Sequence, residues 1–172
     1  MNDAETIELR EAVDGDLPIL FEHQRDPEAN AMAAFPARDW GAFVAHAART
    51  HVDEAVTSRT IVVDGQVAGS IVCWLDETGE RDVGYWLGRQ FWGRGLATRA
   101  LTAFLELVPD RPLHARVAKH NVGSLRVLEK CGFIIVGEDL VAFDTGPDEV
   151  EEWILRLTVR PDDIVESTPR LG

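Results

Sequence analysis

Alternation of apolar and polar residues predicts strands near both ends of the chain and in its middle. Residues 6–13 (TIELREAV) alternate with a period of two, which is typical of a half-buried strand. In 55–75, Asp64-Gly65 divides two β-rich runs and predicts a tight hairpin, because this pair favours a two-residue turn. Further strand-like runs cover 81–88, 113–118, 133–143 and 150–160. The pattern therefore predicts about seven strands.

Helical periodicity fills the intervals between these runs. Asp14-Gly15-Asp16 forms a turn that can cap a helix from Leu17, and Asp26-Pro27 breaks that helix. The next segment, 29–37, is small and apolar without a clear period, and we interpret it as a connection. The remaining helical patterns are 39–50, 96–108 and 121–132. About four helices are expected.

The order of elements is strand, two helices, three strands, helix, strand, helix and two strands. This order predicts a mixed α+β fold, because it lacks the βαβα alternation of a doubly wound parallel sheet. A chain of 172 residues is long enough for one filled core. We expect a single domain over 1–160 and a polar C-terminal tail over 161–172.

Composition excludes several functional classes. The net charge of −13 argues against a nucleic-acid partner, which would need clustered Lys and Arg. The same charge suits a cationic substrate, or simply serves solubility. Cys73 and Cys131 lie in apolar surroundings without metal-ligand spacing, which favours buried free thiols and predicts no metal site. With neither a leader pattern nor a spanning apolar run, we expect a cytoplasmic protein with no membrane partner.

Two glycines and an arginine mark the junction between a strand and the helix over 96–108. The stretch QFWGRGLATRAL (90–101) has Gly-Arg-Gly where Ser, Thr or Asp would cap a helix better. Free N–H groups and the helix dipole attract anions at a helix N-terminus, and glycine lets a phosphate approach the backbone. Arg94 can add positive charge at the rim. The segment therefore indicates a pyrophosphate cradle.

Other phosphate-binding motifs do not fit this stretch. A Walker loop needs Gly-Lys-Ser/Thr, and a dinucleotide fingerprint needs GxGxxG early in a βαβ unit. The pattern Gln90-x-x-Gly93-x-Gly95 instead resembles the acetyl-coenzyme A signature of the GNAT superfamily of N-acetyltransferases. A second segment, NVGSLRVLEKCGF (121–133), resembles the RimJ/RimL-type branch, the ribosomal-protein N-terminal acetyltransferases. The resemblance covers 82–138.

The resemblance implies a fold, a co-substrate and binding residues. It implies the GNAT fold, a twisted, mostly antiparallel mixed sheet whose fourth and fifth strands splay around the pantetheine arm of acetyl-coenzyme A (acetyl-CoA). Asn121 would lie near the thioester, although it equally suits the N-cap of its own helix. By position, the residues implied to bind the cofactor are Trp86, Leu87, Gly88, Gln90, Gly93, Arg94, Gly95, Leu96, Ala97, Thr98, Asn121 and Ser124.

Candidates for the chemistry are less specific. The base that receives the amine proton could be the carboxylate of Asp82, Asp144 or Glu138, although each would more commonly be a surface carboxylate. A relay through ordered water is the alternative. Many family members place a tyrosine beside the leaving thiolate, but the matching position here is Leu128. Ser124 becomes the best candidate donor to the thioester sulfur, and it could equally satisfy only the first helical turn.

Tyr85, the only tyrosine, lies on a different element from the family tyrosine and is not expected to replace it. The hypothesis is an N-acetyltransferase acting on a small amine or a peptide N-terminus. The alternative is a non-catalytic acyl-CoA-binding protein. Dimers are common among similar proteins, so a homodimer is an open expectation.

Overall fold

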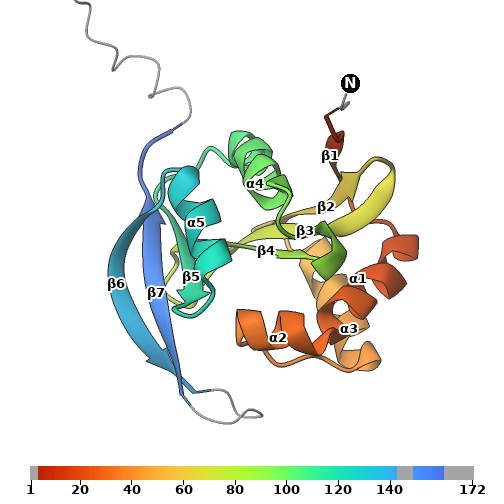
Figure 1. Ribbon diagram of the computed structural model, residues 1–172, viewed down its shortest axis with the longest axis horizontal. Helices are drawn as coiled ribbons and strands as arrows, with labels where there is room; N and C mark the ends of the chain where they lie inside the picture. Colours follow the sequence, from red (N-terminus) through yellow and green to blue (C-terminus); the bar gives the residue numbers. More distant parts are fainter. Residues whose placement is uncertain (1–3, 143–148, 161–172) are drawn as a thin grey trace, which may run out of the picture.

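Seven strands form one twisted sheet in the order β1-β2-β3-β4-β5-β7-β6 (Figure 1). The computed structural model describes residues 4–142 and 149–160. The strands are β1 Ile7–Arg10, β2 Thr57–Val63, β3 Gln66–Leu75, β4 Arg81–Leu87, β5 Leu113–Ala118, β6 Ile134–Val141 and β7 Val150–Leu157. The predicted α+β class and the seven strands are confirmed.

The Asp64-Gly65 hairpin forms as expected between β2 and β3. Asp64 and Gly65 have φ angles of 47° and 79°, the left-handed values that a tight two-residue turn requires. The Asp64 side chain also accepts a hydrogen bond from the Thr6 backbone N–H at 2.8 Å. This contact joins the hairpin to the start of β1, the neighbouring strand.

The sheet opens between its fourth and fifth strands. β4 and β5 are parallel and pair only at Arg81 with Leu113 and at Asp82 with His114. Beyond these pairs β5 continues alongside β7, its antiparallel neighbour on the other side. The C-terminal half of β4 therefore has no strand partner on the β5 side, which confirms the predicted splay.

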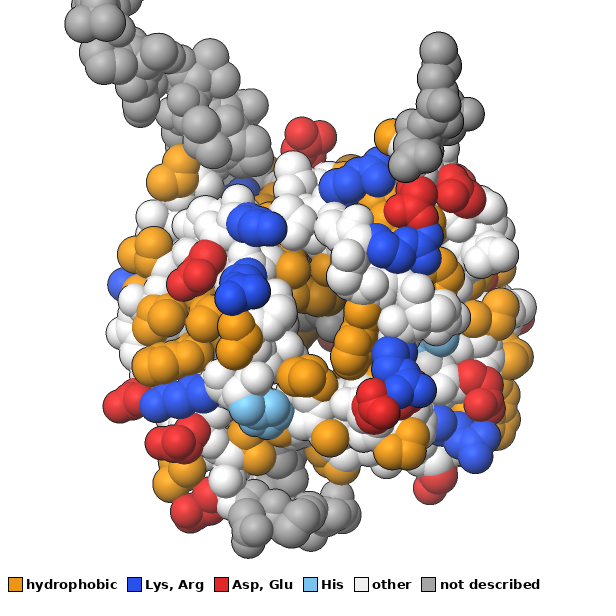
Figure 2. Space-filling model, in the orientation of Figure 1, with side chains coloured by type: hydrophobic (Ala, Val, Ile, Leu, Met, Phe, Trp, Pro, Cys, Tyr) orange, Lys and Arg blue, Asp and Glu red, His pale blue; other side chains and the backbone are white. Residues whose placement is uncertain are grey.

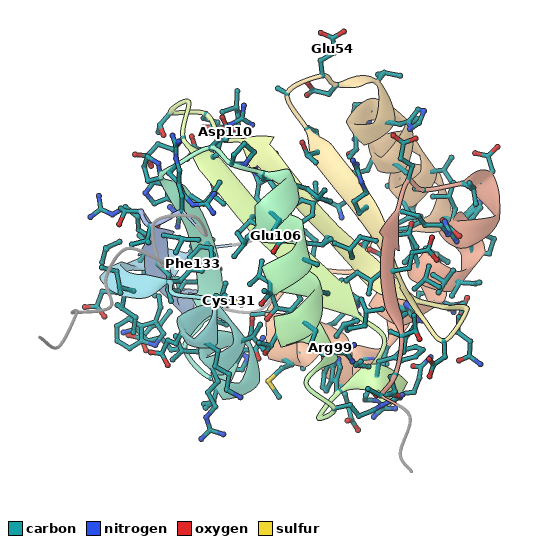
Figure 3. All side chains as sticks on the ribbon, turned by 90° about the horizontal axis from the view of Figure 1, so that it is seen from above. Glu54, Arg99, Glu106, Asp110, Cys131 and Phe133 are labelled. Carbon is teal, nitrogen blue, oxygen red and sulfur yellow. The ribbon has the colours of Figure 1, made fainter. Side chains whose placement is uncertain are left out.

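One face of the sheet packs against two helices, α4 Leu96–Leu107 and α5 Val122–Lys130. The apolar stripe of α4 includes Leu101 and Phe104, whose side chains are fully buried. In the view from above, α4 lies across the strands, with Arg99 and Glu106 along its length and Cys131 just beyond α5 (Figure 3). The Cys131 thiol lies 3.7 Å from the Thr98 carbonyl oxygen, so α4 and α5 touch directly.

Three more helices occupy the first third of the chain: α1 Leu17–Arg25, α2 Pro27–Ala33 and α3 Trp40–Val52. The sequence predicted a connection where α2 lies, so five helices replace the expected four. The physical reason is Asp26, whose carboxylate accepts hydrogen bonds from the N–H groups of Glu28 and Ala29. Pro27 then occupies the first helical position, where its missing N–H costs nothing. Asp26-Pro27 thus ends α1 and starts α2.

Asp16 has a different role from the predicted helix cap. Its side chain makes no capping bond to α1 and is instead buried against the Arg10 guanidinium, at 2.7 and 2.9 Å. The Thr60 hydroxyl donates a further hydrogen bond to it at 3.0 Å. These bonds to Arg10 hold the pKa of Asp16 below its usual value. The turn therefore ties β1 to β2 through a partly buried ion pair.

Among the described residues, no helix is long and apolar enough to cross a bilayer. The predicted tail over 161–172 lies outside the described residues.

Candidate functional site

A cavity of about 570 Å³ lies where β4 and β5 diverge. Its walls come from the end of β4, the N-terminus of α4, the start of α5 and the inner side of α2. The space-filling view shows this hollow near the centre of the face, with apolar side chains around it (Figure 2). Most of the predicted cofactor residues line it, namely Trp86, Leu87, Gly93, Gly95, Leu96, Ala97, Thr98, Asn121 and Ser124.

The glycines shape the cradle by their backbone conformation. Gly93 and Gly95 both have φ of 72°, a left-handed value that other residues adopt only with strain. A Cβ added at either position would meet no atom within 4 Å. Gly95 is the N-cap of α4, and no side chain caps this helix. The first N–H groups of α4 therefore face open space, as an anion site requires.

Arg94, between the two glycines, is held by contacts with Glu5, Phe91 and Gln90. Its guanidinium forms an ion pair with Glu5 and lies 5.5 Å from the centre of the Phe91 ring. It also donates a hydrogen bond to the Gln90 carbonyl oxygen at 3.2 Å. Arg94 and Gln90 do not line the cavity, so their predicted contact with the cofactor stays a prediction.

Gly88 also lies outside the cavity lining. A Cβ built on it would come within 2.7 Å of the His23 Nε2 atom on α1, so the missing side chain makes room for α1. The Trp86 indole N–H donates to the His23 carbonyl oxygen at 3.3 Å in the same region. The end of β4 is thereby fixed against α1. Burial holds the pKa of His23 below its usual value.

Two basic side chains that the sequence reasoning missed, Arg126 and Lys130, line the cavity from α5. They are four positions apart and so lie on the same face of the helix. Figure 2 shows Lys and Arg side chains on the α5 side of the hollow. No Asp or Glu is among the described residues that line this cavity. Its charge therefore favours an anionic ligand.

Asn121 has both of the roles that the sequence allowed. Its side-chain oxygen accepts a hydrogen bond from the Ser124 backbone N–H at 3.2 Å, which confirms it as the N-cap of α5. It also lines the cavity, facing the unpaired half of β4. On that side the Leu87 carbonyl oxygen accepts a hydrogen bond from the Trp92 indole N–H at 3.0 Å, and the other backbone groups of this half of β4 have no strand partner, so they are open to the amide groups of an extended ligand.

Tyr85 and Ser124 meet in the cavity wall. The Tyr85 hydroxyl oxygen lies 2.8 Å from Ser124 Oγ, and both residues line the cavity. Burial raises the pKa of Tyr85 to about 12. The sequence reasoning set Tyr85 aside because it lies on a different element from the family tyrosine, but alternation along β4 puts it on the same side as Val83 and Leu87, toward α5. That alternation was the signal that could have found it.

Asp82 lies at the closed end of the gap, in the last pair that joins β4 to β5. It does not line the cavity, and its side chain points to the opposite side of the strand from Tyr85. Asp82 is 8% exposed, and burial raises the pKa of its carboxyl. A buried acid with a raised pKa is suited to accept a proton near neutral pH.

The other candidate acids differ in their surroundings. Glu138 on β6 is exposed and forms an ion pair with Lys119. Asp144 lies outside the described residues. Within the described ranges, no group of three or more His, Cys, Asp or Glu side chains is arranged to hold a metal ion.

His120 joins the two sides of the cavity. Its Nε2 atom forms a hydrogen bond with the Ala31 carbonyl oxygen of α2 at 2.8 Å. His120 precedes Asn121 at the start of α5, so this bond fastens α2 to the α5 side of the gap. His120 lies in the turn after β5, so a turn residue makes this bridging contact.

Comparison with known proteins identifies the type of domain. Residues 6–134 match the family model described as the acetyltransferase (GNAT) domain, which covers most of the chain. No protein with a curated function matches the sequence significantly.

Many solved structures share the fold. RimL, the ribosomal L7/L12 alpha-N-protein acetyltransferase in complex with coenzyme A, matches with a TM-score of 0.76 and 18% identity, over 90% of this chain and 95% of its own. Spermidine N-acetyltransferase from Vibrio cholerae, in complex with coenzyme A and spermine, matches with a TM-score of 0.75 and 13% identity, over 91% of this chain and 96% of its own. The microcin C7 self-immunity acetyltransferase MccE, in complex with acetyl-CoA and AMP, matches with a TM-score of 0.73 and 19% identity, over 89% of this chain and 92% of its own.

Proposed function

The chain belongs to the GNAT family of acetyl-CoA-dependent N-acetyltransferases, and we propose that it transfers acetyl directly to a primary amine within a ternary complex. The acceptor is a small-molecule amine or a peptide N-terminus. The observation that carries the proposal is the opening between β4 and β5, which joins an uncapped helix N-terminus to a wall of unpaired backbone. Such a gap suits an extended cofactor whose phosphates lie at one end.

The residues that line the cavity support one orientation for acetyl-CoA. Its phosphates would lie against the α4 N-terminus, where Gly93 and Gly95 leave room, with Arg126 and Lys130 beside them. The pantetheine arm would follow the free edge of β4 toward Asp82. From Leu87 to Asp82 the strand rises by roughly 17 Å, at about 3.3 Å per residue. The thioester would therefore lie inside the sheet, close to Ser124.

Asp82 is our candidate for the group that receives the amine proton. An alkyl ammonium with a pKa near 10.4 costs roughly 4 to 5 kcal/mol to deprotonate at pH 7, whereas an α-amine near 8 costs roughly 1 kcal/mol. The raised pKa of Asp82 makes it a stronger base than an exposed aspartate. Because it faces away from the cofactor side of β4, an amine would reach it from the face that carries α1.

The same chemistry distinguishes two classes of acceptor amine. The named structural neighbours include an acetyltransferase of a ribosomal protein N-terminus and one bound to spermine. An α-amine needs little help to lose its proton, whereas a polyamine needs a base. The dependence of the rate on Asp82 therefore separates these two acceptor classes.

Thiol release from acetyl-CoA, measured against N-terminal peptides, polyamines, aminoglycosides and amino-acid analogues, tests the proposal. We expect turnover with at least one amine, and Asp82→Asn to lower kcat about 100-fold for an alkylamine acceptor. Glu77→Gln, which removes an exposed carboxylate in the turn between β3 and β4, is the matched control and should keep full activity. Coenzyme A binding without thiol release across the panel would instead support the non-catalytic alternative.

A homodimer is also part of the proposal. β6 is an edge strand of the sheet, and its exposed side chains include Ile134, Val136 and Leu140. Exposed apolar residues along an unpaired strand favour association with another chain. Light scattering on the purified protein should give twice the monomer mass, and the monomer mass at high concentration would contradict the proposal.

A further inference from the structure

The hydrogen bond between Tyr85 and Ser124 joins β4 to α5 across the cavity wall. Tyr85 comes from β4 and Ser124 from the first turn of α5, yet their hydroxyl oxygens are 2.8 Å apart. Both residues line the cavity, and Tyr85 is the lining residue of β4 nearest in sequence to Arg81 and Asp82, which pair with β5. Among the described residues this is the one hydrogen bond between two side-chain hydroxyl groups in the cavity wall.

The direction of this hydrogen bond decides what Ser124 can do. A hydroxyl group has one hydrogen to donate and two lone pairs to accept with. A phenol is a stronger acid than an aliphatic alcohol, so the partly buried Tyr85 hydroxyl is the better donor of the two. When Tyr85 donates, the Ser124 oxygen accepts and its own hydrogen is left free to turn into the cavity.

We propose that Tyr85 is a positioning residue, whose hydroxyl donates to Ser124 Oγ and thereby aims the Ser124 hydrogen at the sulfur of bound coenzyme A. This rests on the proposed function of the same site. Two chained hydrogen bonds strengthen each other, because the first polarises the group that makes the second. The N-terminus of α5 adds partial positive charge at Ser124, which also favours a negative sulfur.

The neutral amine nitrogen forms a bond to the thioester carbonyl carbon, and the carbon–sulfur bond breaks with its electron pair moving to sulfur. The amine loses its proton to the base or to water, and the coenzyme A thiolate leaves stabilised by the Ser124 O–H. Tyr85 keeps its proton throughout. A proton from solvent then restores the thiol.

A binding experiment tests the proposal without turnover. The pKa of the coenzyme A thiol is measured in its complex with the protein by the ultraviolet absorbance of the thiolate. An O–H donor at sulfur favours the thiolate, so the wild-type complex should lower this pKa below its free value of about 8.5. Ser124→Ala should abolish most of that shift and Tyr85→Phe about half of it. If the thiol pKa in the Ser124→Ala complex equals that in the wild-type complex, the proposal is overturned. This outcome can be read even if the protein proves inactive.

A double-mutant cycle on kcat then separates positioning from a general structural effect. We expect Tyr85→Phe to lower kcat about tenfold and Ser124→Ala about 50-fold, with the KM for acetyl-CoA nearly unchanged. In the Ser124→Ala background, removing the Tyr85 hydroxyl should have no further effect, because there is no serine to position. A full tenfold loss in that background would show that Tyr85 acts independently and would refute the proposal.

Thr102→Val is the matched control for loss of a hydroxyl group. The Thr102 hydroxyl donates to the Thr98 carbonyl oxygen on α4 at 2.8 Å and lies outside the cavity lining. We expect this variant to keep both the thiol pKa and kcat of the wild type. If Thr102→Val shifts both as much as Tyr85→Phe does, the effect is not specific to the Tyr85–Ser124 pair and the proposal fails.

Discussion

Replacing Gly95 with tryptophan should abolish coenzyme A binding while the protein remains folded. Gly95 has a φ of 72°, and a Cβ there meets no atom within 4 Å, so the indole would extend into the space over the α4 N-terminus. A left-handed conformation costs a residue with a Cβ roughly 1–2 kcal/mol. For a chain of this size that cost lowers Tm by roughly 2–8 °C. Loss of the phosphate contacts should raise the Kd of coenzyme A at least 100-fold, or about 2.7 kcal/mol.

Gly65→Trp is the control that isolates the cradle. Gly65 has a φ of 79° and also has no atom within 4 Å of an added Cβ, but it lies at the tip of the β2–β3 hairpin. The two variants should therefore lose similar stability, and Gly65→Trp should bind coenzyme A within twofold of the wild type. Calorimetric titration and thermal melts measure both quantities. Equal affinity in Gly95→Trp and Gly65→Trp would refute the assignment of the cradle.

Three further predictions concern charged residues. Glu5→Gln should release Arg94 from its ion pair and lower the Kd of coenzyme A two- to threefold, because a part-exposed ion pair contributes roughly that much free energy. Adding Arg94→Ala should cancel this gain, and calorimetry measures both. Arg126→Glu should raise the Kd of coenzyme A about tenfold at low salt, and the loss should shrink as salt is added. Asp16→Asn should lower the free energy of unfolding by about 2 kcal/mol at pH 7, measured in urea. Because Arg10 lowers the folded-state pKa of Asp16, the wild type should lose this advantage only as the pH falls below about 4.

Local sequence patterns predicted the strands and most helices because the contacts that form these elements are made within the same short segments. The Asp64-Gly65 hairpin has the left-handed backbone that its residues favour, and Asn121 caps the helix that follows it. α2 was missed because its seven residues are too few to show a helical period. Its start depends on the Asp26 side chain, and Asp26-Pro27 has the same sequence whether it ends a helix or begins one.

The candidate site was predictable where one segment supplies it and less so where several meet. Gly93 and residues 95–98 line the cavity from one contiguous segment, so a single motif indicated them together. Tyr85 and Ser124 are 39 positions apart, and no spacing rule joins them. Arg126 and Lys130 face the cavity because α5 rotates them toward it, and that rotation is set by the burial of Leu128 on the opposite side. Tertiary packing therefore decides which polar residues reach the cofactor.

The distribution of charge explains how a chain with a net charge of −13 can bind a cofactor that is itself anionic. The charged side chains that line the cavity are Arg126 and Lys130, and no described acid lines it. Acidic side chains lie instead on strands beyond the opening, where Asp139 and Glu152 flank Arg116, at 2.9 and 3.6 Å. The anionic cofactor is thus attracted locally, while the overall field favours a cationic acceptor over an anionic one. An amine and acetyl-CoA can then meet at the sheet opening without competing for the same charges.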